Sequence, residues 1–148
     1  MVEIVPARLV HVGPIASRIR DIDRLECEVF GHSAKQALRN GVYYSDQAWT
    51  ALVNGRPEAM FGCVTASAIS GMGTPWFLGT DEVYRHGKAL VMFGPYFVRA
   101  IVDSTPNLSN LVSSANDKAI RLLKLWGFTV GEEILVGDVP FRHFSMRA

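Results

Sequence analysis

The sequence predicts an α+β fold, with a mixed, mostly antiparallel seven-stranded sheet flanked by about four helices. Strand-like and helix-like segments follow in the order strand, two helices, three strands, helix, strand, helix, two strands. The turn pairs Asn54-Gly55 and Gly137-Asp138 lie between strand-like runs and favour antiparallel hairpins. One helix-like segment separates the fourth strand from the fifth, which favours a parallel pair joined by a right-handed crossover.

The composition predicts one domain, residues 1–148, with a substantial apolar core. Hydrophobic residues make up 49% of the chain and charged residues 20%, and the net charge is +1. No apolar run approaches the ~20 residues that span a bilayer. The balanced charge predicts neither a nucleic-acid partner nor an anionic membrane surface. We therefore expect a small or local partner.

Cysteine usage and the N-terminal residues indicate a reducing compartment. The two cysteines, Cys27 and Cys63, are far apart and form no disulfide framework, and the first residues lack the apolar core of a signal peptide. These observations predict a cytoplasmic protein.

The first half of the chain predicts a strand, two helices and a hairpin. Glu3–Val12 is short and rich in β-branched residues, and Gly13-Pro14 then suits the start of a helix. Apolar residues recur at helical intervals up to Gly31, and a second helix is expected over Ser33–Gly41. Two strand-like runs between residues 47 and 65 flank the Asn54-Gly55 turn.

The second half predicts the remaining elements. Trp76–Thr80 is expected to be the fourth strand, and the apolar stretch Gly87–Asp103 a helix that Pro95 interrupts. Leu108–Ser113 is expected to be the fifth strand. Two last strands, Glu133–Val136 and Val139–Met146, are expected around the Gly137-Asp138 turn.

The segment between residues 113 and 128 reads as a strand end, a capped helix and a helix stop. Ser114 or Asn116 can accept a hydrogen bond from a first-turn N–H group. Gly127 and Phe128 suit a Schellman cap at the other end. Four apolar residues form a single stripe at helical spacing: Ala119, Leu122, Leu123 and Trp126.

This helix resembles the fourth-helix motif of the GNAT (Gcn5-related N-acetyltransferase) superfamily, N-x-x-A-x-x-L-Y-x-x-x-G-F. Asn116, Ala119, Leu122 and the Gly127-Phe128 pair match the motif. Leu123 stands where many members carry the tyrosine that protonates the leaving thiolate. The order of elements over the whole chain is also that of the GNAT fold, and the resemblance implies a sheet splayed between strands 4 and 5.

The turn before the third predicted helix resembles the superfamily's pyrophosphate loop, R/Q-x-x-G-x-G/A. Gly87 and Ala89 match this pattern, whereas Tyr84 departs from it. Donors or positive charge from Arg85, His86 and Lys88 surround the glycine, and a helix N-terminus favours anions. An ordinary strand-to-helix turn is the alternative interpretation.

The resemblance implies an N-acyltransferase that moves acetyl from acetyl-CoA to an amine of a small molecule or protein. It implies that the pantetheine arm follows Leu78, Gly79 and Thr80, and that Asn116 reaches it. The reaction requires a general base. Glu28 is the candidate, with His32 beside it, although a solvated helix end explains both residues equally well.

The second hypothesis is a catalytically degenerate GNAT-like binding or structural protein. The chain is similar to short GNAT-like proteins of tailed phages, some of them internal virion proteins of podoviruses. That resemblance implies the host cytoplasm or the virion as the location, and a homodimer or a virion assembly as the oligomeric state.

Two other chemistries are expected to be absent. The four histidines show no metal-ligand spacing with one another or with the two cysteines, so no metal site is expected. Cys63 lies in a predicted strand. A cysteine there is more commonly a small buried hydrophobic residue than a thiol nucleophile.

Overall fold

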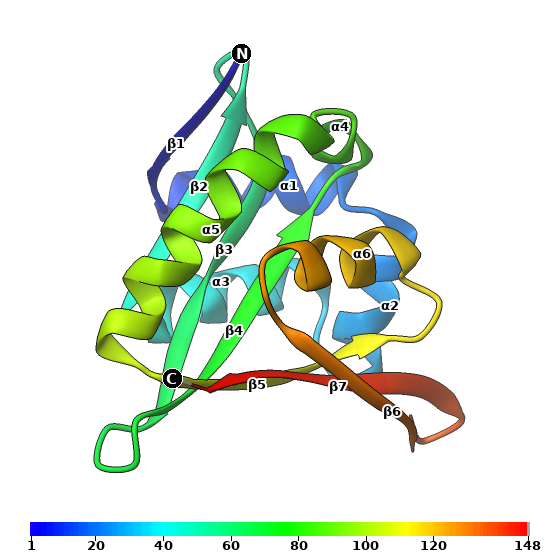
Figure 1. The fold of residues 1–148 in the computed structure, drawn as a ribbon. Coiled ribbons are helices and arrows are strands. Elements are labelled where there is room, and N and C mark those ends of the chain that lie inside the picture. The colour runs from blue at the N-terminus through cyan, green and yellow to red at the C-terminus, as the bar shows by residue number, and fades with distance from the viewer. Residues whose placement is uncertain (148) are drawn as a thin grey trace. The chain divides into compact units, whose positions relative to one another are not determined.

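A computed structural model describes residues 1–147, which form seven strands, six α-helices and one 3-10 turn (Figure 1). The strands are β1 Val2–Pro6, β2 Gln47–Val53, β3 Arg56–Ser67, β4 Met72–Gly79, β5 Asn107–Ser113, β6 Thr129–Val136 and β7 Val139–Arg147. The helices are α1 Val12–Arg18, α2 Asp21–Val29, α3 Ala34–Tyr44, α4 Asp81–Tyr84, α5 Gly87–Ser104 and α6 Asp117–Leu125, and η1 is Leu9–His11.

The seven strands follow the order β1-β2-β3-β4-β5-β7-β6, and β4 and β5 are parallel. The pairs β1–β2, β2–β3, β5–β7 and β6–β7 are antiparallel. This arrangement confirms the predicted mixed, mostly antiparallel sheet. The chain forms two compact units, one of Met1–Val64 with Trp76–Gly87 and one of Thr65–Pro75 with the chain from Lys88 on.

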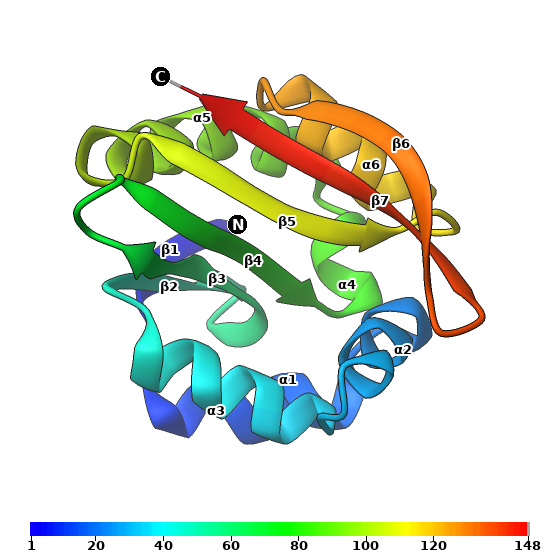
Figure 2. The ribbon, with the colours of Figure 1, turned by 90° about the horizontal axis from the view of Figure 1, so that it is seen from below.

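In the first unit, α1 and α3 lie side by side (Figure 2). Four buried apolar side chains from these helices and β3 form a core cluster, and Trp76 and Leu78 of β4 pack against it. Burying one such side chain stabilises a fold by about 1.5–3 kcal/mol. The cluster consists of Val12, Ile15, Leu38 and Met60.

The predicted first hairpin is confirmed by its backbone. Asn54 and Gly55 have φ angles of 51° and 83°, and these two left-handed residues connect β2 to β3. Consecutive left-handed residues are typical of the type I′ turn, whose twist matches that of the flanking strands.

The structure differs from the prediction at the first strand and helix. The strand ends at Pro6, η1 follows, and α1 begins before Gly13, because His11 is held by hydrogen bonds to Arg8 N–H and the Thr50 hydroxyl. The continuous helix expected up to Gly31 is broken: Ile19 and Arg20 are extended, with ψ near 146°. The break separates α1 from α2.

The break between α1 and α2, together with one additional short helix, raises the number of α-helices from about four to six. The short α4 follows β4 directly, where the sequence predicted only a turn. The helix expected to stop at Gly41 continues to Tyr44. Gly41 lies inside it and packs closely, since an added Cβ would lie 2.5 Å from the Trp76 ring. The glycine therefore marks a contact and not a helix end.

In the second unit, α5 and α6 lie side by side, and the Trp126 indole N–H donates to the Leu90 carbonyl at 3.0 Å. Helix α5 contains Pro95 and continues beyond it to Ser104. Within the same unit, β5 pairs with β7 from Asn107 opposite Arg147 to Ser113 opposite Phe141.

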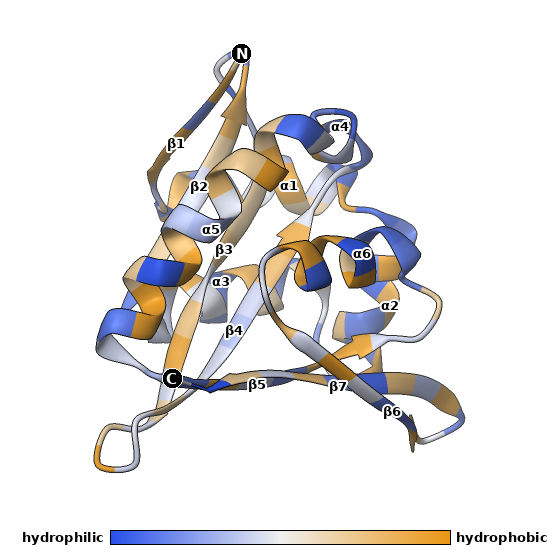
Figure 3. Cartoon of the chain, in the orientation of Figure 1, coloured by the Kyte–Doolittle hydropathy of each residue, from blue (hydrophilic) through white to orange (hydrophobic). Residues whose placement is uncertain are grey.

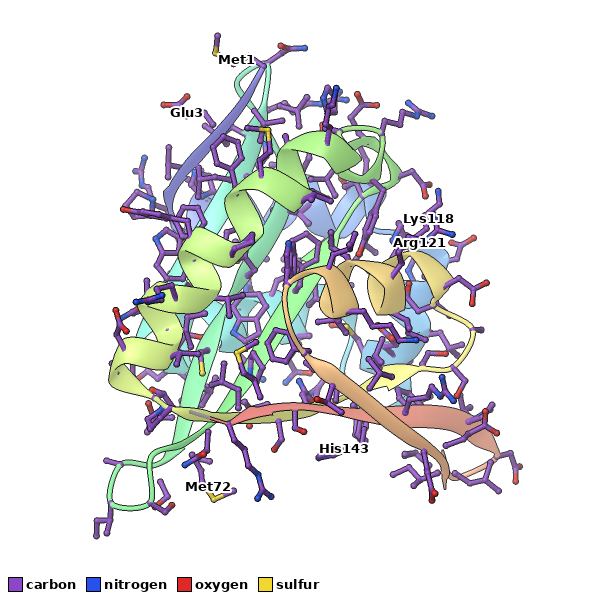
Figure 4. All side chains as sticks on the ribbon, in the orientation of Figure 1. Met1, Glu3, Met72, Lys118, Arg121 and His143 are labelled. Carbon is purple, nitrogen blue, oxygen red and sulfur yellow. The ribbon has the colours of Figure 1, made fainter. Side chains whose placement is uncertain are left out.

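The predicted caps of α6 are confirmed. Asn116 and not Ser114 is the N-cap, since its side chain accepts from Ala119 N–H at 3.4 Å. Gly127 has φ 100°, and Phe128 N–H donates to the Leu123 carbonyl, as in a Schellman motif. Lys118 and Arg121, labelled on this helix in Figure 4, are both exposed, whereas Leu122 of the predicted apolar stripe is buried.

Candidate functional site

The end of β4 carries three predicted ligand-binding residues. The side chain of Leu78 packs on the apolar cluster of the first unit. Gly79 is buried, and Thr80 is the N-cap residue of α4. An added Cβ on Gly79 would lie 2.9 Å from Val83 and 3.2 Å from Ala59, so β4 packs here as only glycine allows. This segment is therefore closely packed.

The backbone of Gly79 already has partners within its own unit. Its N–H donates to Asp23 Oδ2 at 2.9 Å, and its carbonyl accepts from Arg20 N–H at 3.1 Å. The N–H of the next residue, Thr80, donates to the carbonyl of Glu58 on β3 at 2.9 Å. A ligand that pairs with the Gly79 backbone must replace the first two of these bonds.

The partners of Gly79 form a buried polar group at the break between α1 and α2. Asp23 is 1% exposed, and Arg20 Nη2 donates to its Oδ1 at 2.7 Å. The Arg20 guanidinium carbon lies 3.9 Å from the centroid of the Tyr84 ring, a cation–π distance. Burial and the neighbouring Asp23 carboxylate raise the pKa of the Tyr84 phenol, so the phenol stays protonated at neutral pH.

A second buried carboxylate, Glu58 of β3, is 0% exposed. Its oxygens accept from the Thr80 hydroxyl at 2.7 Å, from Arg56 Nε at 2.7 Å and from Arg18 Nη1. Burial alone would raise the pKa of Glu58, but these three hydrogen bonds and the Arg18 charge lower it below its ordinary value. Glu58 is therefore held ionised and does not suit the role of a general base.

The predicted pyrophosphate loop runs from the end of α4 into α5. Arg85 Nη1 lies 2.7 Å from Glu82 Oε2, and His86 Nε2 lies 3.4 Å from Glu82 Oε1. Gly87 is the first residue of α5, and an added Cβ there would meet no atom within 4 Å. Figure 3 shows the hydrophilic colouring of this turn around α4.

The other predicted site residues lie on different elements. Lys88 and Ala89 lie in the first turn of α5, and Asn116, which is 3% exposed, is the N-cap of α6. All three residues belong to the second unit. Glu28 is exposed in the last turn of α2, five residues after Asp23 and hence about 7.5 Å further along the helix axis. The role of Glu28 as a base stays a prediction.

Within the second unit, backbone pairing between β4 and β5 gives way to a side-chain hydrogen bond. Met72 and Gly73 of β4 pair with Asn107 and Leu108 of β5. Further along, Asn110 Nδ2 donates to the Pro75 carbonyl at 2.8 Å, and Asn110 Oδ1 accepts from Leu111 N–H at 2.7 Å. A side-chain amide thus makes the bond that a backbone group makes in a regular ladder.

No group of three or more His, Cys, Asp or Glu residues in the described chain, 1–147, is arranged to hold a metal ion. Within the same residues, no helix combines the length and hydropathy needed to cross a bilayer.

Both cysteines are expected to react slowly with iodoacetamide at pH 8 in the folded protein. Burial raises the pKa of Cys27 to about 12 and that of Cys63 to about 11, with added effects from Asp23 and Asp46 respectively. About one thiol in a thousand or fewer is then the reactive thiolate. Mass spectrometry of protein alkylated with and without about 6 M urea, which unfolds the chain, measures the extent of reaction at each cysteine. Rapid alkylation of Cys63 without urea would contradict this prediction.

Comparisons with known proteins agree on the fold. No protein-family model matches the chain, and no curated protein matches it by sequence. Among solved structures, Ard1 from Thermoplasma volcanium superposes with a TM-score of 0.73 at 12% identity, covering 99% of this chain and 97% of that one. A GNAT-family acetyltransferase from Streptococcus pneumoniae superposes with a TM-score of 0.63 at 12% identity, covering 100% of both chains.

This chain has the GNAT fold. A third structure with this fold, AAC(6')-Ib in complex with ribostamycin and coenzyme A, superposes with a TM-score of 0.67 at 14% identity and covers 99% of this chain and 93% of that one. At these identities the likeness establishes the fold. The predicted GNAT-like fold class is therefore confirmed.

Sequence reasoning missed the buried polar residues that surround β4 in this GNAT fold. Asp23 and Arg20 lie in what reads as a solvated helix face, and Glu58 is one acid within an apolar strand. A signal for Glu58 was present, since a lone charge in an apolar strand needs a partner when buried. Nothing local in the sequence identifies Arg20 and Asp23 as partners of Gly79.

Proposed function

We propose that this protein binds acetyl-CoA and transfers its acetyl group to an amine of a small molecule or a protein. The observation that carries the proposal is the open backbone at Gly87, where α5 begins and an added Cβ would meet no atom within 4 Å. The first N–H groups of a helix lack partners within the helix, and its dipole is positive there. That arrangement suits a pyrophosphate.

Side chains beside Gly87 support the same ligand. Arg85, His86 and Lys88 are at least partly exposed around the turn. Their donors can supplement the backbone N–H groups in holding phosphate oxygens. AAC(6')-Ib, whose fold this chain shares, has been solved with coenzyme A and with acetyl-CoA.

The proposed reaction forms a bond between the amine nitrogen and the acetyl carbon and breaks the carbon–sulfur bond. The amine gives up a proton, for which Glu28 or water is the proposed acceptor. The departing thiolate gains a proton. Leu123 has no proton to donate, so water is the proposed donor.

Adding coenzyme A is expected to raise the melting temperature of the wild-type protein. At a hundred times Kd the ligand stabilises by about 2.7 kcal/mol, which corresponds to several degrees for a domain of this size. Gly87→Glu should abolish the shift, because it places a negative side chain where the pyrophosphate approaches. Differential scanning fluorimetry measures both.

Gly13→Glu is the matched control, since an added Cβ at Gly13 also meets no atom within 4 Å near a helix start. It should retain the wild-type shift. No shift for the wild type at millimolar coenzyme A would contradict the proposal, as would equal loss in both variants.

A binding or structural role without turnover is the second candidate. Two observations favour it: the buried carboxylates Asp23 and Glu58 are held in ion pairs, and Leu123 replaces the superfamily's tyrosine. Mass spectrometry of amines incubated with acetyl-CoA and the protein distinguishes the candidates. Binding of coenzyme A with no acetylated amine above the protein-free rate would favour the second candidate.

A further inference from the structure

The edge of β4 that faces away from β3 is occupied from within the chain. Successive residues of a strand direct their backbone groups to opposite edges. Since Thr80 N–H points to Glu58 on β3, the N–H and carbonyl of Gly79 point to the other edge. Under the proposed function, an acyl-CoA arm that pairs with the Gly79 backbone would have to bind along this edge.

The segment on that edge behaves as a short piece of strand. Ile19 forms an antiparallel bridge with Thr80, and Ile19 and Arg20 have extended ψ angles. Arg20 supplies the N–H donor to Gly79 and Asp23 the carboxylate acceptor, at 3.1 and 2.9 Å. One donor and one acceptor thus satisfy both polar groups of a single β4 residue.

Further contacts hold this segment in place. Asp23 is ion-paired to Arg20 at 2.7 Å, and Arg20 stacks on Tyr84. The helix that the apolar spacing predicts through residue 31 is interrupted only here, which lets these groups reach Gly79. We define Arg20 and Asp23 together as the Gly79 latch.

We propose that the Gly79 latch is an autoinhibitory contact that coenzyme A must displace to pair with β4. This proposal rests on the proposed function, because it takes acyl-CoA as the ligand of this edge. The latch lowers the affinity for coenzyme A, because the ligand must first break the charge-assisted hydrogen bond between Gly79 N–H and the Asp23 carboxylate. The carboxylate and the N–H of the latch occupy the places of a ligand's carbonyl and amide.

The test is a calorimetric titration of coenzyme A into the full chain and its variants. Asp23→Ala removes the acceptor of the Gly79 N–H and should tighten binding about tenfold or more. Asp21→Ala is the matched control, since Asp21 lies in the same helical turn, is fully exposed and contacts Arg24. It should bind as the wild type does.

Asp23→Asn guards against misfolding, because the amide keeps the size of the side chain and a neutral acceptor. It should give a smaller tightening than Asp23→Ala. In the wild type, the 13C resonance of the Asp23 carboxyl should shift as coenzyme A saturates the protein. The Asp21 carboxyl resonance should not shift.

The outcomes separate the latch from the proposed function. Tighter binding by either Asp23 variant than by the wild type, with Asp21→Ala unchanged, supports the latch. Equal affinities together with an unmoved Asp23 resonance overturn the latch and leave coenzyme A binding intact. Absence of binding in every folded variant overturns both proposals.

Discussion

Glu58→Ala is expected to lower the free energy of unfolding by about 1–3 kcal/mol, because it removes a buried carboxylate and leaves the buried Thr80 hydroxyl without its acceptor. Glu58 is 0% exposed and accepts from Arg18, Arg56 and Thr80. Of these donors, Thr80 is itself buried, so water does not readily replace the lost acceptor. Urea denaturation followed by circular dichroism measures the change.

Glu82→Ala is the control for this prediction. Glu82 also pairs with an arginine, Arg85, but that pair lies at the surface. Its loss should change stability by no more than about 1 kcal/mol. Equal effects of the two substitutions would contradict the special role of burial at Glu58.

The stability supplied by Glu58 also depends on pH, with a definite sign. Its pKa in the folded protein is below the ordinary value of 4.5, so the folded state favours the ionised carboxylate. The contribution is therefore fully present above the unfolded pKa and is lost as pH falls through the folded pKa. The stability difference between the wild type and Glu58→Gln should shrink below pH 4.5 and stay constant from about pH 6 to 8.

Gly94→Ala is expected to destabilise the protein by about 3 kcal/mol, the upper end of the usual cost of overpacking. An added Cβ would lie 1.8 Å from Nε1 and 2.0 Å from Cε2 of Trp126. The ring would have to move, and its hydrogen bond to the Leu90 carbonyl would be lost. Thermal unfolding followed by tryptophan fluorescence would report both the loss of stability and the displaced ring.

Gly87→Ala tests whether glycine replacement in α5 is costly in general. Gly87 lies in the same helix, where an added Cβ meets nothing within 4 Å. Its replacement should leave stability unchanged or raise it by up to about 1 kcal/mol, because alanine restricts the unfolded chain. If Gly94→Ala changed stability as little as this control does, the prediction that α5 packs closely on Trp126 would be contradicted.

Local signals predicted those elements whose stabilising contacts are local. The Asn54-Gly55 turn and the Gly127 cap of α6 appear where the sequence placed them, and Asn116 is one of the two N-cap residues that the sequence offered. Each depends on a backbone preference or a hydrogen bond within a few residues, and such interactions can be read from neighbours in the chain.

Non-local contacts account for the incorrect boundaries. The helix break at Ile19 and Arg20 comes from bonds to Gly79 and Thr80, some sixty residues later. The glycine at 41 reads as a helix stop in sequence, yet it is required by a ring from β4. In both cases a partner far along the chain overrides the local pattern.

The candidate site divides in the same way. Helix and turn chemistry is local, so the sequence predicted the glycine at the start of α5 and an N-cap of α6 at Ser114 or Asn116. The hydrogen bonds of Gly79 to Arg20 and Asp23 and the ion pairs of Glu58 became apparent only in the folded chain. The physical reason is that burial removes water from these groups, so each must find its partner wherever folding brings one.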